Sequence, residues 1–174
     1  LEIFRKELKT EKAALWQSWN QAAEWCLEKN INLPEALQWA DSAITKSADI
    51  DSLFTPSGIK AQLLQAFERS EEAKLIIEKK LPLASLPEKH NYAMLLLKLG
   101  KIDEGLSLLK RNYQEQPNEA VALIGLIYGY AANTDRKNAL LYANKALSIT
   151  QNQTEKNTLE ILIDKVKKGK RIIE

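Results

Sequence analysis

The sequence predicts an all-α chain built from repeated pairs of helices, and two observations carry this prediction. Among the 174 residues there are only six Gly and five Pro, and the helix-favouring residues Leu, Ala, Lys and Glu outnumber those that favour strands. In addition, the stretch EALQWADSAI at 35–44 returns as NALLYANKAL at 138–147. Both contain Ala-Leu-x-aromatic-Ala-x-x-Ala-aliphatic, and they lie about three times 34 residues apart, which indicates internal repeats.

Two further copies of the small residue lie between these stretches. EEAKLIIEKKL places Ala73, and DEGLSLLKRN places Gly105, where the outer copies have Ala36 and Ala139. The four small residues are separated by 37, 32 and 34 positions, and each follows a short polar turn. Small side chains let two helices cross near the low end of the usual separation of about 8–10 Å. The pattern therefore predicts four helix pairs with close crossings.

The first helix of each pair has an apolar face of its own. In the third pair, Tyr92, Ala93, Leu96 and Leu99 share one helix face, and Gly100 follows as a predicted C-cap. The predicted pairs cover about 10–47, 54–81, 86–117 and 118–150. Residues 1–9 are expected to be a linker from an upstream region and 169–174 a frayed tail.

A single extra helix is predicted over 153–168, where four aliphatic residues recur at helical spacing (Leu159, Leu162, Ile163 and Val166). Its other face is polar, as in the terminal cap of a repeat array. It is expected to cover the second helix of the fourth pair.

These helix pairs resemble the tetratricopeptide (TPR) repeat, which has a period of about 34 residues and small residues where its helices cross. The match covers about residues 11–150. Ala93, Leu96, Gly105, Leu109 and Pro117 carry it in the third pair, and Leu123, Leu126, Ile127, Tyr130, Ala139, Ala143 and Ala146 carry it in the fourth. The resemblance implies a right-handed α-solenoid of about four TPR-like hairpins plus the capping helix.

A weaker resemblance concerns the string WNQAAEWCLEKNINLPEALQWADSAI. It is similar to the start of the repeat region in secreted proteins of Bacteroidetes, which carry an upstream β-rich domain of unknown function. This resemblance implies a periplasmic or secreted protein and assigns no activity. A cytoplasmic location stays open, because Cys26 is the only cysteine and no intrachain disulfide requires an oxidising compartment.

The sequence carries no enzyme signature, since GxGxxG, a phosphate loop, HExxH and CxxC are all missing and His90 and Cys26 fall in different repeats. We therefore expect no catalytic residue, cofactor or metal site. A net charge of +2 favours neither nucleic acid nor an anionic membrane as partner, and no apolar run reaches the roughly 18 residues of a membrane span. The basic run KVKKGKR is interpreted as a lysine-bearing helix end.

In the TPR family, the concave face of the array is lined mainly by the first helices. The resemblance places partner-binding positions at Asn20, Glu24, Gln62, Gln65, His90, Met94, Lys98 and Tyr128, with Leu97, Ile124 and Ala131 beside them. The family's clamp for a terminal carboxylate needs Asn where this chain has Gln62 and Met94, and basic residues where it has Gly58 and His90. A chaperone-tail ligand is thus not expected.

The predicted function is a non-enzymatic protein–protein interaction or scaffold module that binds a peptide or a domain in a concave groove. The alternative is a structural accessory region packed on an upstream domain of a larger secreted protein, which could itself be an enzyme. Trp16 and Trp19 are expected to pack in the first hairpin. Trp25 points off that face and is the candidate docking patch.

Overall fold

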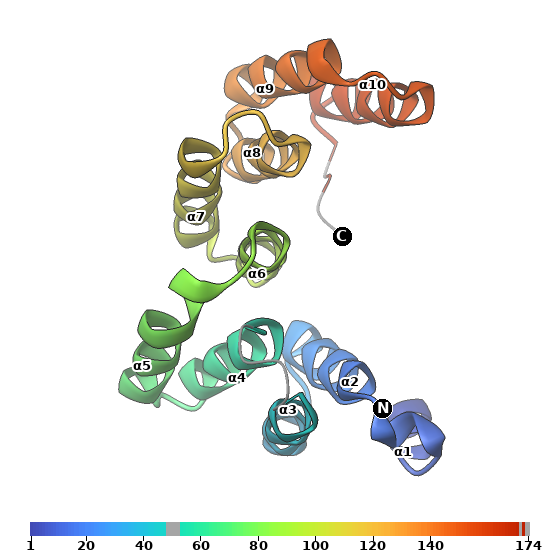
Figure 1. Cartoon of the computed structure of the whole chain (residues 1–174), viewed down its shortest axis with the longest axis vertical. Helices are drawn as coiled ribbons and strands as arrows, with labels where there is room; N and C mark the ends of the chain where they lie inside the picture. Colours follow the sequence, from blue (N-terminus) through green and yellow to red (C-terminus); the bar gives the residue numbers. More distant parts are fainter. Residues whose placement is uncertain (48–52, 171, 173–174) are drawn as a thin grey trace. The chain divides into compact units, whose positions relative to one another are not determined.

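The computed structural model describes residues 1–47, 53–170 and 172 of the chain, and within these ranges it contains helices and no strand (Figure 1). The prediction of an all-α chain is confirmed. The helices are α1 (Glu2–Glu7), α2 (Trp16–Lys29), α3 (Leu33–Lys46), α4 (Thr55–Ala66), α5 (Ser70–Lys80), α6 (Leu86–Lys98), α7 (Ile102–Glu115), α8 (Ala120–Ala132), α9 (Arg136–Ile149) and α10 (Gln153–Lys167). Two short 3₁₀ helices, η1 (Glu11–Ala14) and η2 (Leu81–Leu83), precede α2 and α6.

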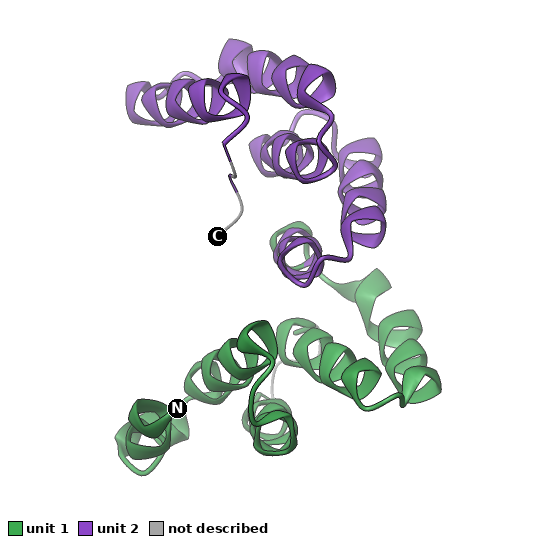
Figure 2. Ribbon diagram, turned by 180° about the vertical axis from the view of Figure 1, so that it is seen from behind, with its two compact units in different colours: residues 1–88 green, residues 89–174 purple. Residues whose placement is uncertain are grey.

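The chain divides into two compact units, unit 1 from Leu1 to Glu88 and unit 2 from Lys89 to Glu174 (Figure 2). In unit 1, α2 packs against α3 and α4 against α5, and α4 also contacts α2 and α3. In unit 2, α6 crosses α7, α8 packs against α9, and α10 packs against α9. The right-handed sense of a solenoid stays a prediction.

The first helix of every pair ends in the same backbone turn. Asn30, Glu68, Gly100 and Thr134 have positive φ angles of 52°, 60°, 78° and 59°. In each case the N–H of the next residue donates to a carbonyl five positions back, as Lys101 does to Leu96 at 2.9 Å. This is the Schellman arrangement that closes a helix and reverses the chain. The predicted C-cap at Gly100 is confirmed. The same turn recurs after α2, α4, α6 and α8, so the backbone conformation repeats along the chain together with the buried small residues.

The small residues lie where the helices cross. Ala36, Ala73 and Ala139 are fully buried. A Cβ atom on Gly105 would lie 2.7 Å from Leu97 Cδ2 and 3.0 Å from the carbonyl oxygen of Ala93. The close crossing that the sequence predicts is therefore present, because the backbone of α6 leaves no room for a larger side chain.

Residues 1–9 differ from the expected linker, because most of them form α1 and pack on the first hairpin. The rings of Phe4 and Trp25 lie 5.5 Å apart, and Leu8 is buried. Arg5 Nη2 lies 2.7 Å from Glu35 Oε2, at the start of α3. The segment is too short for a helical pattern to show in its sequence, and its contacts with α2 and α3 hold it in place.

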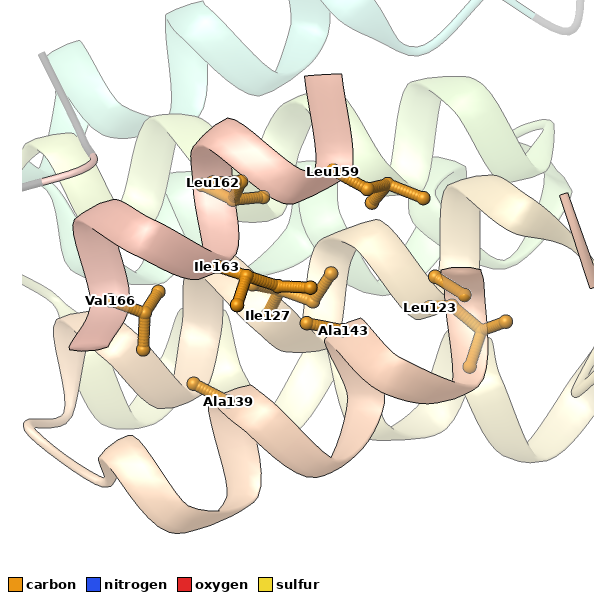
Figure 3. Packing of buried hydrophobic residues seen from close by; sticks show 9 residues of the cluster. Leu123, Ile127, Ala139, Ala143, Leu159, Leu162, Ile163 and Val166 are labelled. Atoms are coloured by element: carbon orange, nitrogen blue, oxygen red, sulfur yellow. The ribbon is translucent and has the colours of Figure 1, made fainter. Parts of the chain in front are cut away.

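Helix α10 closes the core of unit 2 (Figure 3). Its four predicted aliphatic residues, Leu159, Leu162, Ile163 and Val166, are its buried residues. They form one cluster with Leu123 and Ile127 of α8 and with Ala139, Ala143 and Ala146 of α9. Most of the opposite face of α10 is charged or polar and exposed, so this helix lies as a cap on the last helix pair.

Candidate binding surface

The candidate site lies in unit 2, on the first helices α6 and α8. Leu97 follows Met94 by one turn in α6, and Ala131 follows Tyr128 by one turn in α8, so the members of each pair share a helix face. Met94, Tyr128 and Ala131 are half-buried and Leu97 is buried. We call these four residues the α6–α8 surface.

Two neighbouring cavities lie at one end of this surface. The first has a volume of about 260 Å³ and is lined by Leu97, Gly100, Ile102, Ala131, Ala132, Lys170 and Ile172. The second has a volume of about 380 Å³ and is lined by Ala131, Thr134, Arg136, Val166, Gly169 and Lys170. Ala131 and Lys170 belong to both, so the segment that follows α10 forms a wall of each cavity.

From the sequence, residues 169–174 are expected to be a frayed tail. The backbone at Gly169 and Lys170 is instead hydrogen-bonded to the end of α10. Gly169 has a φ of +64°, its N–H donates to the Val166 carbonyl at 3.0 Å, and the N–H of Lys170 donates to Lys165 at 3.0 Å. These bonds end α10 in the same way as the first helices end. Ile172 then packs against the core cluster of unit 2. The other tail residues, 171, 173 and 174, lie outside the described residues.

The predicted binding residues of unit 1 are poorly placed to meet a partner. Asn20 is 6% exposed and Gln62 is 2% exposed, while Glu24 and Gln65 are half-buried. Glu24, Gln62 and Gln65 each take part in an interaction within the protein, whereas Asn20 Oδ1 accepts no hydrogen bond. Asn20 is buried where α2 packs against α3 and α4, and Gln62 is buried where α4 packs against α2, α3 and α5. Their role in binding a partner stays a prediction.

The predicted residues of unit 2 are more accessible. Met94 and Tyr128 lie on the α6–α8 surface, and Lys98 is exposed at the end of α6, with an interaction partner inside the protein. His90 is half-buried, its Nδ1 makes no hydrogen bond, and a Cβ on Gly125 would lie 3.0 Å from that atom. Burial lowers the pKa of His90, so its imidazole is neutral at pH 7.

Trp25, the predicted docking patch, is half-buried and has Phe4 of the chain's own α1 against it. Trp19 is held in the first hairpin by a hydrogen bond of 2.8 Å from its Nε1 to the carbonyl of Ala13. Contacts within the protein therefore cover part of the aromatic surface that Trp19 and Trp25 form in unit 1.

Cys26 lies in the core of unit 1, where burial, and after it the charge of Glu35, raises the pKa of its thiol. A buried thiol of this kind packs as a small apolar side chain. Among the described residues, no group of three or more His, Cys, Asp or Glu side chains could hold a metal ion. Within the same ranges, every helix is too short or too polar to cross a membrane.

Two elements were missed by the sequence analysis, although both leave a signal. Ser85 and Glu88 have the Ser-x-x-Glu spacing of a helix capping box, directly before and within the first turn of α6. Gly169 follows a lysine-rich helix end and marks a C-cap rather than a frayed end.

Comparison with known proteins finds no matching family model and no matching curated protein. Among solved structures, the chain is similar to YrrB, described as "a TPR protein with an unusual peptide-binding site". The two share 19% sequence identity with a TM-score of 0.40, over 91% of this chain and 97% of YrrB. A superposition this loose transfers neither a residue nor a ligand. The TPR-like organisation rests on this chain's own helix pairs, with small residues buried where the helices cross.

Proposed function

We propose that this chain is a helical-repeat protein-interaction module that binds a peptide or an extended segment of a partner protein on the α6–α8 surface. The observation that carries the proposal is the cavity of about 260 Å³ beside Leu97 and Ala131. These are two of the positions where the TPR resemblance places the binding face. Lys170 and Ile172, which come from outside the repeats, already line the same cavity.

The chemistry of the surface suits an apolar side chain within a peptide. Leu97, Ala131 and Ala132 supply small and aliphatic walls. Met94 adds a flexible, polarisable side chain, and Tyr128 adds a ring with a polar tip, both of which are frequent at interfaces. Such a surface gives a ligand apolar area to bury.

The proposal includes no catalytic step. His90 is neutral and half-buried in unit 2, and Cys26 is buried in the core of unit 1. Neither is arranged as a nucleophile with a general base, the pairing on which acyl transfer and hydrolysis commonly rest.

The test is a peptide selection against the whole chain. Peptides taken from a displayed random library are measured for affinity by fluorescence anisotropy with wild type and with the double variant Met94→Ala, Tyr128→Ala. We expect a loss of at least about tenfold, as for truncated residues at the centre of an interface. Leu141→Ala, at a side chain that is 59% exposed on α9, serves as the control and should leave the affinity unchanged. Selected peptides that bind the double variant as tightly as wild type would refute the proposal, provided both proteins melt at the same temperature.

A second candidate function is an accessory region that packs on another domain of a larger protein. It is favoured by Ile3 in α1 and Leu15 between η1 and α2, which are 72% and 55% exposed. Exposed apolar side chains of this kind would be covered if another domain packed on this end of the chain. Slower amide hydrogen exchange at residues 1–15 in a longer form of the protein than in this chain would support this function, and equal rates would count against it.

A further inference from the structure

We propose that unit 1 carries a second interaction surface, an apolar cavity beside α5 that takes an aliphatic side chain from an acidic segment of a partner protein. All residues that line this cavity belong to unit 1, so the inference goes beyond the proposed function of the α6–α8 surface. It is carried by the apolar walls of the cavity, by an exposed leucine at its edge and by the lysines around it.

The cavity lies among α3, α4 and α5 and has a volume of about 260 Å³. Its apolar walls are Ile44 of α3 and Leu75 and Ile76 of α5. Ile76 also packs against the buried cluster around Ala73, so this wall is held by the core of unit 1. The volume lies below the range of about 300–1,000 Å³ for pockets that take small molecules, which favours a single side chain of a peptide as the occupant.

Leu75 lies at the open side of this cavity, because 66% of its surface is exposed. Along α5, all of whose residues are described, Ala73 alone is buried. A single exposed leucine is common on protein surfaces, but one that borders an apolar cavity offers apolar area that an entering side chain would cover.

The charges at the cavity favour an acidic partner. Lys60, Lys79 and Lys80 line it, and no Asp or Glu is among the described residues that do so. Lys60 Nζ lies 2.6 Å from Asp41 Oδ1, which neutralises its charge. Neither Lys79 nor Lys80 forms an ion pair with a residue in the described ranges, so both remain available to carboxylates of a partner.

Each of these two lysines lies one helical turn beyond an apolar wall residue. Lys79 follows Leu75, and Lys80 follows Ile76, by four positions, so each pair shares a face of α5. Lysines in a last helical turn also suit the helix dipole, so their charge alone would not indicate a partner. Together with the apolar walls, it favours a segment whose carboxylates lie within about one helical turn of its aliphatic residue.

The experiment uses the whole chain and a displayed random peptide library as the probe. Peptides are selected on the Met94→Ala, Tyr128→Ala chain, so that ligands of the α6–α8 surface are not recovered. Fluorescein-labelled copies of them are measured by anisotropy with this chain and with further variants of it. Leu75→Ser removes one apolar wall, and Leu83→Ser, at a leucine that is 70% exposed outside the cavity, is its matched control.

A second pair of variants tests the charges. Lys79→Glu, Lys80→Glu reverses both charges at the cavity, and Lys165→Glu, Lys167→Glu, in the last turn of α10, is the control. We expect acidic peptides with an aliphatic residue whose affinity falls at least about tenfold with Leu75→Ser and with the reversal at the cavity, and stays unchanged in both controls. Their affinity should also fall when the NaCl concentration is raised from about 0.05 to 0.5 M, because salt screens exposed charges.

Three results would overturn the proposal. A selection that enriches no peptide, or only peptides that bind the Leu75→Ser variant unchanged, removes the surface as a binding site. Peptides that need Leu75 but carry no Asp or Glu, and bind equally after the reversal at the cavity, remove the acidic partner. All variants must melt at the temperature of the chain used for selection, which is expected because Leu75 and Lys79 are exposed.

Other occupants of the cavity would give different results. A second copy of the chain would appear as a wild-type dimer in sedimentation that Leu75→Ser converts to a monomer. An anionic membrane would appear as binding to phosphatidylserine vesicles that the reversal at Lys79 and Lys80 abolishes. Either result, without a peptide that is sensitive to Leu75→Ser, overturns the acidic segment as partner. Because the selection uses a chain without the Met94 and Tyr128 side chains, its outcome does not depend on the proposed function.

Discussion

The carboxylate of Glu88 accepts a hydrogen bond of 2.7 Å from the backbone N–H of Phe54, 34 residues earlier in the chain. The same oxygen, Oε1, accepts from the N–H of Thr55 at 3.3 Å. Glu88 Oε2 accepts from the backbone N–H and the hydroxyl of Ser85 at 3.1 and 2.8 Å. One side chain thus satisfies N–H groups at the start of α4 and completes a capping box at the start of α6.

Replacing Glu88 by Gln should lower the free energy of unfolding of the chain by about 1–3 kcal/mol. The amide has only one oxygen to accept the bonds that two carboxylate oxygens accept now, so N–H groups lose their partner. Urea unfolding followed by circular dichroism measures the difference. Glu160→Gln, on the exposed face of α10, is the control and should change little. Equal stability of the Glu88→Gln variant and wild type would show that water replaces these bonds at no cost.

The contribution of Glu88 should depend on pH. Burial favours the neutral carboxyl, but the hydrogen bonds from Phe54, Ser85 and Thr55 together outweigh it and lower the pKa of Glu88. Because the folded pKa lies below the unfolded value of about 4.3, the stabilisation is complete above that value. It is lost as the pH falls through the folded pKa. The difference in stability between wild type and Glu88→Gln should therefore shrink below about pH 4, and a difference that grows on acidification would contradict this sign.

Thr134→Gly should raise the stability by about 0.5–1 kcal/mol. Thr134 has a φ of 59°, a conformation that a β-branched residue adopts only with strain and that glycine adopts freely. Gly100→Ala, at the equivalent turn with a φ of 78°, should lower it by a similar amount. The control is Asn133→Gly, at a φ of −79°, where glycine relieves no strain and should be neutral or destabilising. Thermal unfolding compares the four proteins, and a Thr134→Gly variant less stable than wild type would refute the argument.

Gly105→Ala should destabilise the chain by about 1–3 kcal/mol, because the new Cβ would lie 2.7 Å from Leu97 Cδ2 and 3.0 Å from the backbone oxygen of Ala93. The neighbouring exposed position offers a matched control in the same helix, Ser107→Ala, which should be neutral or slightly stabilising. Chemical denaturation measures the free energy of unfolding of both variants. If Gly105→Ala is as stable as Ser107→Ala, the crossing of α6 and α7 is looser than these distances indicate.

A chain that ends at Asn152 should be less stable and should self-associate. It loses the four buried aliphatic side chains of α10 and exposes the α8 and α9 residues that they cover. Each such side chain contributes about 1.5–3 kcal/mol gross, part of which is offset by the entropy of ordering the helix. Melting curves and size-exclusion chromatography measure both effects, and a monomeric fragment with unchanged melting temperature would show that α10 is not a cap.

A chain that ends at Lys168 provides the comparison for that truncation. From the sequence, its free energy of unfolding is expected to match that of wild type, whereas the Gly169 cap and the packing of Ile172 indicate a small loss of stability, on the order of 1 kcal/mol. The melting temperature of this variant therefore tests whether the segment after α10 contributes to the folded state.

Much of this fold could be predicted from the sequence, because the features involved are local. The spacing of Ala36, Ala73, Gly105 and Ala139 reflects the length of one helix pair. The aliphatic residues of α10 mark one side of one helix, and Gly100 marks one turn. Periodicity and backbone preference act within a few residues, so they can be read without knowing what packs against them.

Which of the candidate binding residues are buried was decided by the tertiary structure. Asn20 and Gln62 have the polar character of surface residues, yet they are buried because α2 packs against α3 and α4, and α4 packs against α2, α3 and α5. Whether these side chains are buried depends on the order in which the helices stack, and the sequence of a single helix does not determine that order. The same holds for Ile172, which packs against a cluster built from α8, α9 and α10, and for Glu88, whose partner Phe54 belongs to the previous repeat. Helical period and turns follow from short-range sterics and hydrogen bonding, whereas burial and accessibility follow from contacts between residues far apart in the chain, which exist only once it has folded.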